Sequence, residues 1–135
     1  MAVDQLLRTE QNGSLSFGNH TLAEKAKLED YKYNGDLMKV KTYKSMTKLE
    51  KNGLFAYESV PGTSVYNFVE TEAGVDFNVE GAEDAQITIG LEEDAKYEVI
   101  VNGSSAGVMD TNMGGKLSFN VELGSEIAAI SIKKA

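Results

Sequence analysis

The dipeptide Asn-Gly occurs four times in this chain, at Asn12-Gly13, Asn34-Gly35, Asn52-Gly53 and Asn102-Gly103. Both residues accept the positive φ angles of a type I′ turn, so this pair is the strongest short signal for a β-hairpin. Further glycines and the Pro61-Gly62 pair divide the rest of the chain at intervals of roughly ten residues. Turns this frequent leave room only for short antiparallel strands. The spacing therefore predicts an all-β fold of the β-sandwich type.

Between these turns apolar and polar residues alternate, which is the pattern of a strand with one buried face. The alternation predicts strands over residues 75–79, 86–91, 97–101, 117–123 and 128–132. Their apolar positions should share one core, consisting of Val75, Phe77, Val79, Ile87, Ile89, Tyr97, Val99, Val101, Leu117, Phe119, Val121, Ile130 and Ile132. We expect about nine or ten short strands in an antiparallel sandwich that is immunoglobulin-like or jelly-roll-like.

The hairpin around Asn102-Gly103 can be given a register. A two-residue loop pairs Val101 with Ser104, Val99 with Ala106 and Tyr97 with Val108. This register places the apolar residues of both strands on one face. Pattern and turn therefore agree for this pair of strands.

Two segments are less well defined. Residues 21–30 hold Leu22 and Ala26 at a helical spacing, but so few apolar positions support a short helical turn and a coil equally. Residues 1–18 predict a short hairpin, 6–10 with 14–17, that has few core-forming side chains. Such an arm can pack on a neighbouring molecule. The chain has no linker, repeat or low-complexity tract, so we expect residues 1–135 to form a single domain.

Composition excludes several classes of function. Cysteine is absent, which rules out disulfides, thiolate nucleophiles and thiolate metal centres. The net charge of −8 opposes binding to nucleic acids and to anionic membranes. No apolar run reaches the roughly 18 residues of a membrane-spanning helix. The start of the chain lacks the pattern of a signal peptide, so we expect a cytoplasmic protein, or one exported by a route that needs no such signal.

The charge is distributed unevenly along this acidic chain. Residues 25–51 hold eight of the twelve lysines and four acidic residues, a net charge of +4. Residues 58–98 hold eleven acidic residues and one lysine, a net charge of −10. If the fold keeps these segments apart, one molecule presents two surfaces of opposite sign.

No residue stands out as catalytic. His20 is the single histidine, it lies in a polar stretch, and one imidazole without a partner is a poor candidate for a general base or a metal ligand. We therefore predict a position in a surface loop for His20. With His20 as the only histidine, the sequence offers no spacing that favours a nucleophilic triad at a serine or threonine.

Two other patterns have simpler explanations. Residues 107–117 are rich in glycine, but Asp110 and Leu117 stand where a phosphate-binding loop requires Gly and Ser or Thr. We expect a glycine turn that leads into a strand. The acidic pairs and triplets at Glu83-Asp84 and at 92–94 lack the ligand spacing of a calcium loop, so we interpret them as solvated turns. No metal or other cofactor is predicted.

Several segments of the chain carry a family resemblance. They are Leu6-Leu7-Arg8-Thr9-Glu10, residues 12–18, residues 36–42, residues 57–63, residues 83–88 and residues 111–118. Together these segments, spread over nearly the whole chain, resemble a family of short clostridial proteins of about this length that carry the automatic label "endosialidase". The resemblance is to a family with no established activity.

The label can be tested against the residues. Sialidases of the propeller type bind the sialic acid carboxylate with a cluster of three arginines, on a domain several times larger. Arg8 is the only arginine here, and lysines lack the planar fork that grips a carboxylate through two hydrogen bonds. The composition therefore argues against catalysis on sialic acid.

The sequence favours a non-catalytic structural or interaction protein that associates with copies of itself, as a homo-oligomer or a filament. The alternative is a small binding module for a saccharide or another protein, since Tyr31, Tyr33, Tyr43, Tyr57 and Tyr66 could offer rings for sugars to stack on. An enzyme is the least favoured class.

Overall fold

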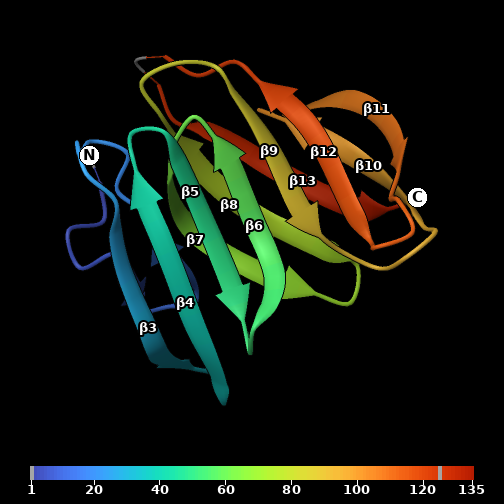
Figure 1. The fold of residues 1–135 in the computed structure, drawn as a ribbon. Coiled ribbons are helices and arrows are strands. Elements are labelled where there is room, and N and C mark those ends of the chain that lie inside the picture. Colours follow the sequence, from blue (N-terminus) through green and yellow to red (C-terminus); the bar gives the residue numbers. More distant parts are fainter. Residues whose placement is uncertain (1, 125) are drawn as a thin grey trace.

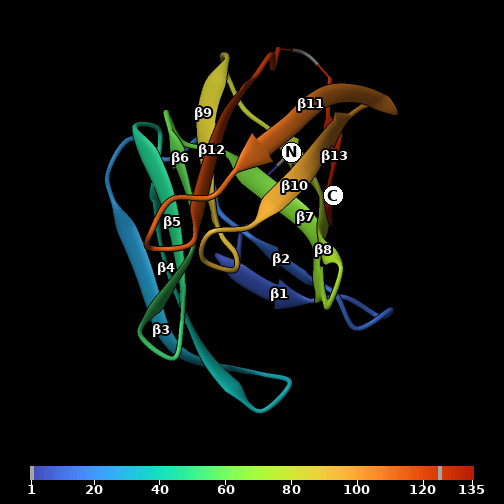
Figure 2. The same cartoon turned by 90° about the vertical axis from the view of Figure 1, so that its right-hand side faces the viewer.

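The computed structural model describes residues 2–124 and 126–135, which form thirteen strands and no helix. The strands make two antiparallel sheets that pack face to face (Figure 1 and Figure 2). This architecture confirms the predicted all-β sandwich. No helix in the described part of the chain is long and apolar enough to cross a membrane.

The seven-stranded sheet, called sheet A below, lies behind in Figure 1. Its spatial order is β1 (Leu7–Thr9), β2 (Leu15–Phe17), β7 (Ser64–Thr71), β8 (Gly74–Glu80), β13 (Ala128–Lys134), β10 (Lys96–Val101) and β11 (Ser104–Asp110). The six-stranded sheet, called sheet B, has the order β12 (Lys116–Val121), β9 (Ala85–Gly90), β6 (Leu54–Val60), β5 (Met46–Lys51), β4 (Asp36–Tyr43) and β3 (Ala26–Tyr33).

Thirteen strands exceed the nine or ten that we expected. The additional strands are short or only partly buried, so they give a weak sequence pattern. In β3, for example, Leu28 and Tyr31 are half-buried and a bulge between them breaks the alternation. Residues 21–25 form no helix, and the segment then enters β3 directly.

Three of the four Asn-Gly pairs are two-residue hairpin turns, as predicted. Asn34-Gly35, Asn52-Gly53 and Asn102-Gly103 each have positive φ at both positions, from 50° to 84°. They join β3 to β4, β5 to β6 and β10 to β11. Asn12-Gly13 differs, because it lies in the longer connection between β1 and β2 and only Gly13 has a positive φ.

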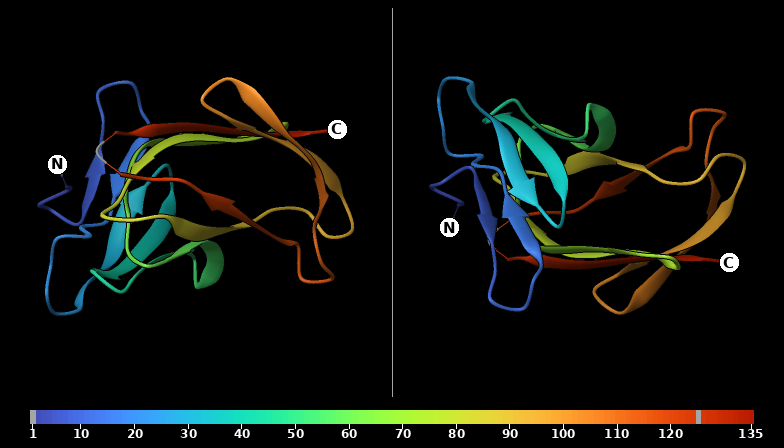
Figure 3. Two further views of the ribbon diagram at one scale, coloured as in Figure 1. Left: turned by 90° about the horizontal axis from the view of Figure 1, so that it is seen from above. Right: turned by 90° about the horizontal axis from the view of Figure 1, so that it is seen from below.

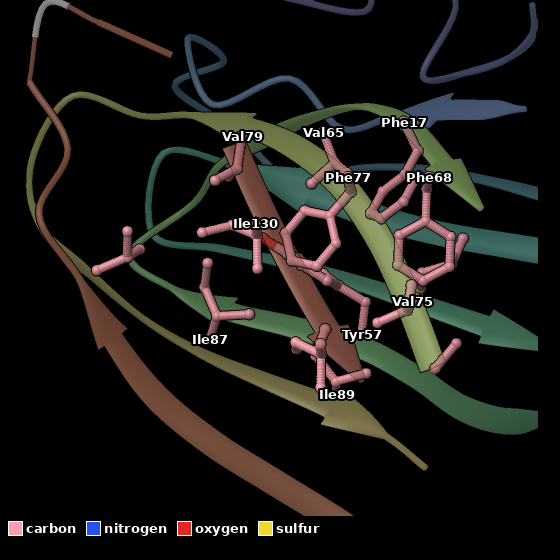
Figure 4. Close-up of a cluster of buried hydrophobic side chains, with 14 of the residues drawn as sticks. Phe17, Tyr57, Val65, Phe68, Val75, Phe77, Val79, Ile87, Ile89 and Ile130 are labelled. Atoms are coloured by element: carbon pink, nitrogen blue, oxygen red, sulfur yellow. The ribbon is translucent and has the colours of Figure 1, made fainter. Parts of the chain in front are cut away.

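The core lies between the two sheets (Figure 4). The rings of Phe17, Tyr57, Phe68 and Phe77 pack mainly edge to face, with centroids 5.2–6.4 Å apart. Of the thirteen residues predicted to share one core, twelve are buried in it, and the half-buried Val101 packs against it. The period of two thus identified the inward face of these strands correctly.

The predicted register of the β10–β11 hairpin is wrong beyond its turn. Val101 does pair with Ser104, but Val99 pairs with Gly107 and Tyr97 pairs with Met109. A bulge between Val99 and Ile100 places one more residue in β11, which shifts every later pair by one position. As a result Met109 packs against the core, while the side chain of Val108 is 57% exposed.

The N-terminal hairpin is not the detached arm that the sequence suggested. Leu7, Leu15 and Phe17 are buried in the core of their own chain, and β2 pairs with β7 as part of sheet A. Two tyrosines of β3 also hold the hairpin: the Tyr31 hydroxyl lies 2.9 Å from the Oγ1 of Thr9, and the Tyr33 hydroxyl donates to the carbonyl oxygen of Gly13 at 2.7 Å. The hairpin therefore closes this flank of the sandwich.

Candidate functional site

His20 lies in the connection between β2 and β3, as the sequence predicts, but its ring is engaged. Nδ1 of His20 lies 2.7 Å from the Oγ of Ser64, the first residue of β7, and the backbone N–H of His20 donates to the same oxygen at 3.3 Å. Burial lowers the pKa of His20, and the Glu80 carboxylate opposes this shift. No local sequence pattern indicates this pair, because its members lie 44 positions apart.

The pairing of Ser64 with His20 does not make a catalytic site. A nucleophilic serine must present its hydroxyl to a substrate while a base accepts its proton. Ser64 is completely buried, and its Oγ is already the acceptor for the backbone of His20. The pair instead joins the β2–β3 connection to the first residue of β7, an interior strand of sheet A.

Arg8, the single arginine, lies opposite Ser16 across β1 and β2. Its Nη2 and Nε donate to the Oε2 of Glu10 at 2.9 and 3.1 Å, and the Ser16 hydroxyl donates to the same oxygen. The hydrogen bond from Ser16, followed by that from Arg8, lowers the pKa of Glu10. The guanidinium is thus held in place next to a carboxylate of this chain.

The outer face of sheet A contains two adjoining hollows. The larger, of about 410 Å³, lies over β8 and β13 and reaches Gly103 at the tip of the β10–β11 hairpin. The smaller, of about 290 Å³, lies between Arg8 and Tyr66. Asn67 and Asn78 line both hollows. In Figure 2 and Figure 3 the β1–β2 and β10–β11 hairpins project beyond this face on either side, and we call the hollowed surface between them the sheet A groove.

The side chains at the centre of the sheet A groove are held in fixed positions. Asn67 occupies a bulge of β7 with a left-handed φ of 56°. Its Oδ1 accepts a hydrogen bond from the Ser14 hydroxyl at 3.0 Å, and its backbone N–H donates to the Oγ of Ser16 at 3.2 Å. Beside it the Tyr66 hydroxyl donates to Glu80, and burial together with this carboxylate raises the pKa of Tyr66. The polar edge of the groove is therefore preorganised.

The floor of the sheet A groove is formed by small side chains on β13. Ala129 and Ser131 lie between Asn78 and Asp76 of β8 on one side and Ile100 of β10 on the other. Among the described residues, the Oγ of Ser131 is the single buried side-chain polar atom without a hydrogen-bond partner. An unpartnered buried hydroxyl is unfavourable, and this atom has almost no accessible surface.

The lysine-rich segment forms one surface. Its strands β3, β4 and β5 are neighbours in sheet B, and Lys27, Lys41 and Lys48 lie directly opposite one another on adjacent strands. None of the three makes an ion pair with a described residue. Lys39, on the same side of β4, lies opposite Glu50 and 3.9 Å from Glu29. We call the outer surface of these three strands the lysine face.

Part of the acidic segment 58–98 lies in connections at the ends of the sandwich, whereas Glu58, Asp76 and Glu98 lie within strands. The β8–β9 and β12–β13 connections lie at the same end, at the top of Figure 1, and carry Glu83, Asp84, Glu122 and Glu126. We call this the acidic end. Its four carboxylates form no ion pair within the described part of the chain. Residues 92–94 lie in the separate β9–β10 connection. Over residues 2–124 and 126–135 no three His, Cys, Asp or Glu side chains are placed to hold a metal ion.

The remaining sequence candidates are dispersed. Tyr57 is buried in the core, Tyr31 and Tyr33 bind the β1–β2 hairpin, and Tyr43 lies under the amine of Lys25, so the five tyrosines form no common platform. Only Tyr66 lines the sheet A groove. In the glycine-rich segment 107–117, residues 107–110 lie in β11, and residues 111–115 form the predicted turn that leads into β12.

Comparisons with protein-family models, with curated proteins and with solved structures find no match to this chain.

Proposed function

We propose that this chain is a non-catalytic structural protein that associates with copies of itself, and that the contact joins the lysine face of one copy to the acidic end of the next. The single observation that supports the proposal best is the row of Lys27, Lys41 and Lys48 in direct cross-strand register. Like charges placed directly opposite in a sheet lower its stability. Glu58 of β6 lies opposite Lys48 at one end of the row, whereas Lys27 and Lys41 are opposed only by lysines. An anionic surface that covers the row relieves this repulsion.

The acidic end has the complementary charge. Glu83, Asp84, Glu122 and Glu126 are exposed, and the last three line a hollow of about 320 Å³. Because the lysine face lies on the side of sheet B and the acidic end lies at the end of the sandwich, the two surfaces point in different directions. A contact between them joins unlike patches on identical molecules, and such a contact closes into a ring or continues as a filament.

Charge reversal tests this contact. Lys41→Glu with Lys48→Glu should abolish self-association, and Glu122→Lys with Glu126→Lys should do the same. The four substitutions together reverse both surfaces, so they should restore it. Light scattering at about 20 mM and about 500 mM salt measures the assembly, because screening at the higher ionic strength weakens contacts between exposed charges.

The control is Lys96→Glu with Lys134→Glu, which changes the net charge by the same amount away from the lysine face. This pair should leave the assembly intact. A protein that stays monomeric at high micromolar concentration in low salt contradicts the proposal. So does an oligomer that is insensitive to both charge-reversed pairs.

A further inference from the structure

We infer that the sheet A groove is a binding site for an uncharged oligosaccharide of two or more linked units. This site is independent of the proposed self-association, which uses sheet B and one end of the sandwich. The inference combines the charge, the chemistry, the shape and the backbone pairing of the groove.

The charges that line the groove balance. Its two cations are Arg8 and Lys133, and its two carboxylates are Glu10 and Asp76. Arg8 is bonded to Glu10 within the chain, so its charge is already compensated. A ligand of either sign would find no excess of the opposite charge, so the electrostatics favour a neutral, polar ligand.

The polar groups of the groove suit vicinal hydroxyls. Carboxylates accept hydrogen bonds, a guanidinium donates them, and an amide does both, so the groove offers donors and acceptors side by side. Asn67 and Asn78 stand where the two hollows meet, and the backbone bulge fixes the position of Asn67. These few fixed polar groups are what gives a binding site its selectivity.

The apolar part of the groove suits the C–H faces of a sugar ring. Ile100 and Ala129 line the larger hollow, and Ile127, which is 47% exposed, lines the smaller one. The volumes of about 410 and 290 Å³ lie near the lower end of the range for ligand pockets. Two adjoining hollows with shared walls fit a chain of linked units better than one small molecule.

The backbone pairing argues against a peptide as the ligand. An extended peptide commonly binds by adding a strand to the open edge of a sheet. The strands under the groove have no open edge: β8 is paired with β7 and β13, and β13 is paired with β8 and β10. Recognition here must rely on side chains, which suits a ligand that presents hydroxyl groups all along its length.

An NMR titration of the full-length, ¹⁵N-labelled protein tests the site. The probes are cellotetraose, chitotetraose and maltotetraose, with sialyllactose as the charged comparison. We expect at least one neutral tetrasaccharide to shift the amide signals of residues 76–78 and 129–131 while sialyllactose shifts none of them. Asn78→Ala should weaken the binding about fivefold or more, the usual effect of losing one hydrogen bond.

Two further variants separate binding from folding. Ala129→Arg places a long side chain in the larger hollow at an exposed position and should abolish the titration while the fold remains intact. Asn120→Ala, which removes an amide from the exposed side of β12, should leave the affinity unchanged. The inference is overturned if none of the three neutral tetrasaccharides binds at millimolar concentration, if Ala129→Arg binds as well as the unmodified protein, or if sialyllactose is the better ligand.

Discussion

At the scale of single residues, the close approach of two backbone segments at Gly62 sets a steric limit. A Cβ atom at this position would lie 1.9 Å from the carbonyl oxygen of Tyr43, and the Gly62 N–H donates to the carbonyl of Lys44 at 3.0 Å. The β4–β5 turn therefore rests directly on this glycine. No side chain fits here unless one of the two segments moves.

We predict that Gly62→Ala lowers the free energy of unfolding by about 1–3 kcal/mol, the usual cost of forcing extra atoms into a packed site. Urea denaturation followed by circular dichroism measures the change. The matched control is Gly124→Ala, since a Cβ atom there meets nothing within 4 Å. Equal free energies of unfolding for the two variants would show that the backbone contact at Gly62 leaves room for a side chain.

The lowered pKa of His20 predicts that the stability of the fold depends on pH. Burial lowers its pKa below 6.5 in the folded state, while the unfolded chain keeps the ordinary value. As the pH falls below 6.5, the unfolded state therefore takes up a proton before the folded state does. Stability is fully present above this pH and decreases below it, until the folded-state pKa is also passed.

Urea denaturation between about pH 7.5 and about pH 5 should show this loss, and His20→Gln should reduce it, because the amide cannot titrate in that window. The carboxylate of Glu10 does not interfere. Its folded pKa is lowered from 4.5, so its contribution is lost as the pH falls below 4.5 and through that lowered value, which is outside this window. A His20→Gln variant with the same pH dependence as the unmodified protein would contradict the assignment.

At the scale of elements, the β1–β2 hairpin is part of the core and not a detached arm. Phe17 is fully buried, and its ring lies 5.2 Å from that of Tyr57 and 5.5 Å from that of Phe68. These contacts join the hairpin to strands of both sheets. We predict that Phe17→Ala lowers the free energy of unfolding by about 3–5 kcal/mol, the usual effect of removing a buried aromatic ring.

Thermal and urea denaturation measure this effect. Leu54→Ala is the control, because the Leu54 side chain is 72% exposed at the β5–β6 turn and should contribute no more than about 0.5 kcal/mol. If the hairpin were a detached arm, Phe17→Ala would be as mild as Leu54→Ala.

At the scale of the whole molecule, the same charges have opposite effects on two properties. The lysine row lowers the stability of the monomer, and in our proposal it favours self-association. Lys41 lies between Lys27 and Lys48, so Lys41→Glu replaces two repulsive cross-strand pairs with attractive ones. We predict that this substitution raises the stability of the monomer by about 0.5–1 kcal/mol while it weakens self-association. Urea denaturation at low salt and at a protein concentration low enough to keep the chain monomeric measures the first effect.

Lys39→Glu supplies the contrast on the same strand. Lys39 lies opposite Glu50 and near Glu29, so its reversal creates repulsion and should lower the stability. The opposite signs expected for two neighbouring lysines separate the effect of local pairing from that of net charge. Equal changes in the free energy of unfolding for the two substitutions would mean that cross-strand pairing does not determine how the charges of the lysine face affect stability.

Much of this fold could be predicted from the sequence, because its strongest signals are local. Three Asn-Gly pairs form the expected two-residue turns, since their backbone preferences belong to the two residues themselves. The alternation over strands such as β8 and β12 identified their buried face, since the side chains of a strand point alternately to its two sides. Both features require no knowledge of distant partners.

Tertiary structure decided the features that depend on distant residues. The burial of Phe17 against Tyr57 and the pairing of His20 with Ser64 join segments that lie far apart in the chain, and their contact leaves no local pattern. The same holds for the sheet A groove, in which Asn67 and Asn78 come from one hairpin but Arg8 and Ser131 come from opposite ends of the chain. Sequence periodicity determines which side of a strand is buried, whereas the order of strands in a sheet determines which side chains become neighbours.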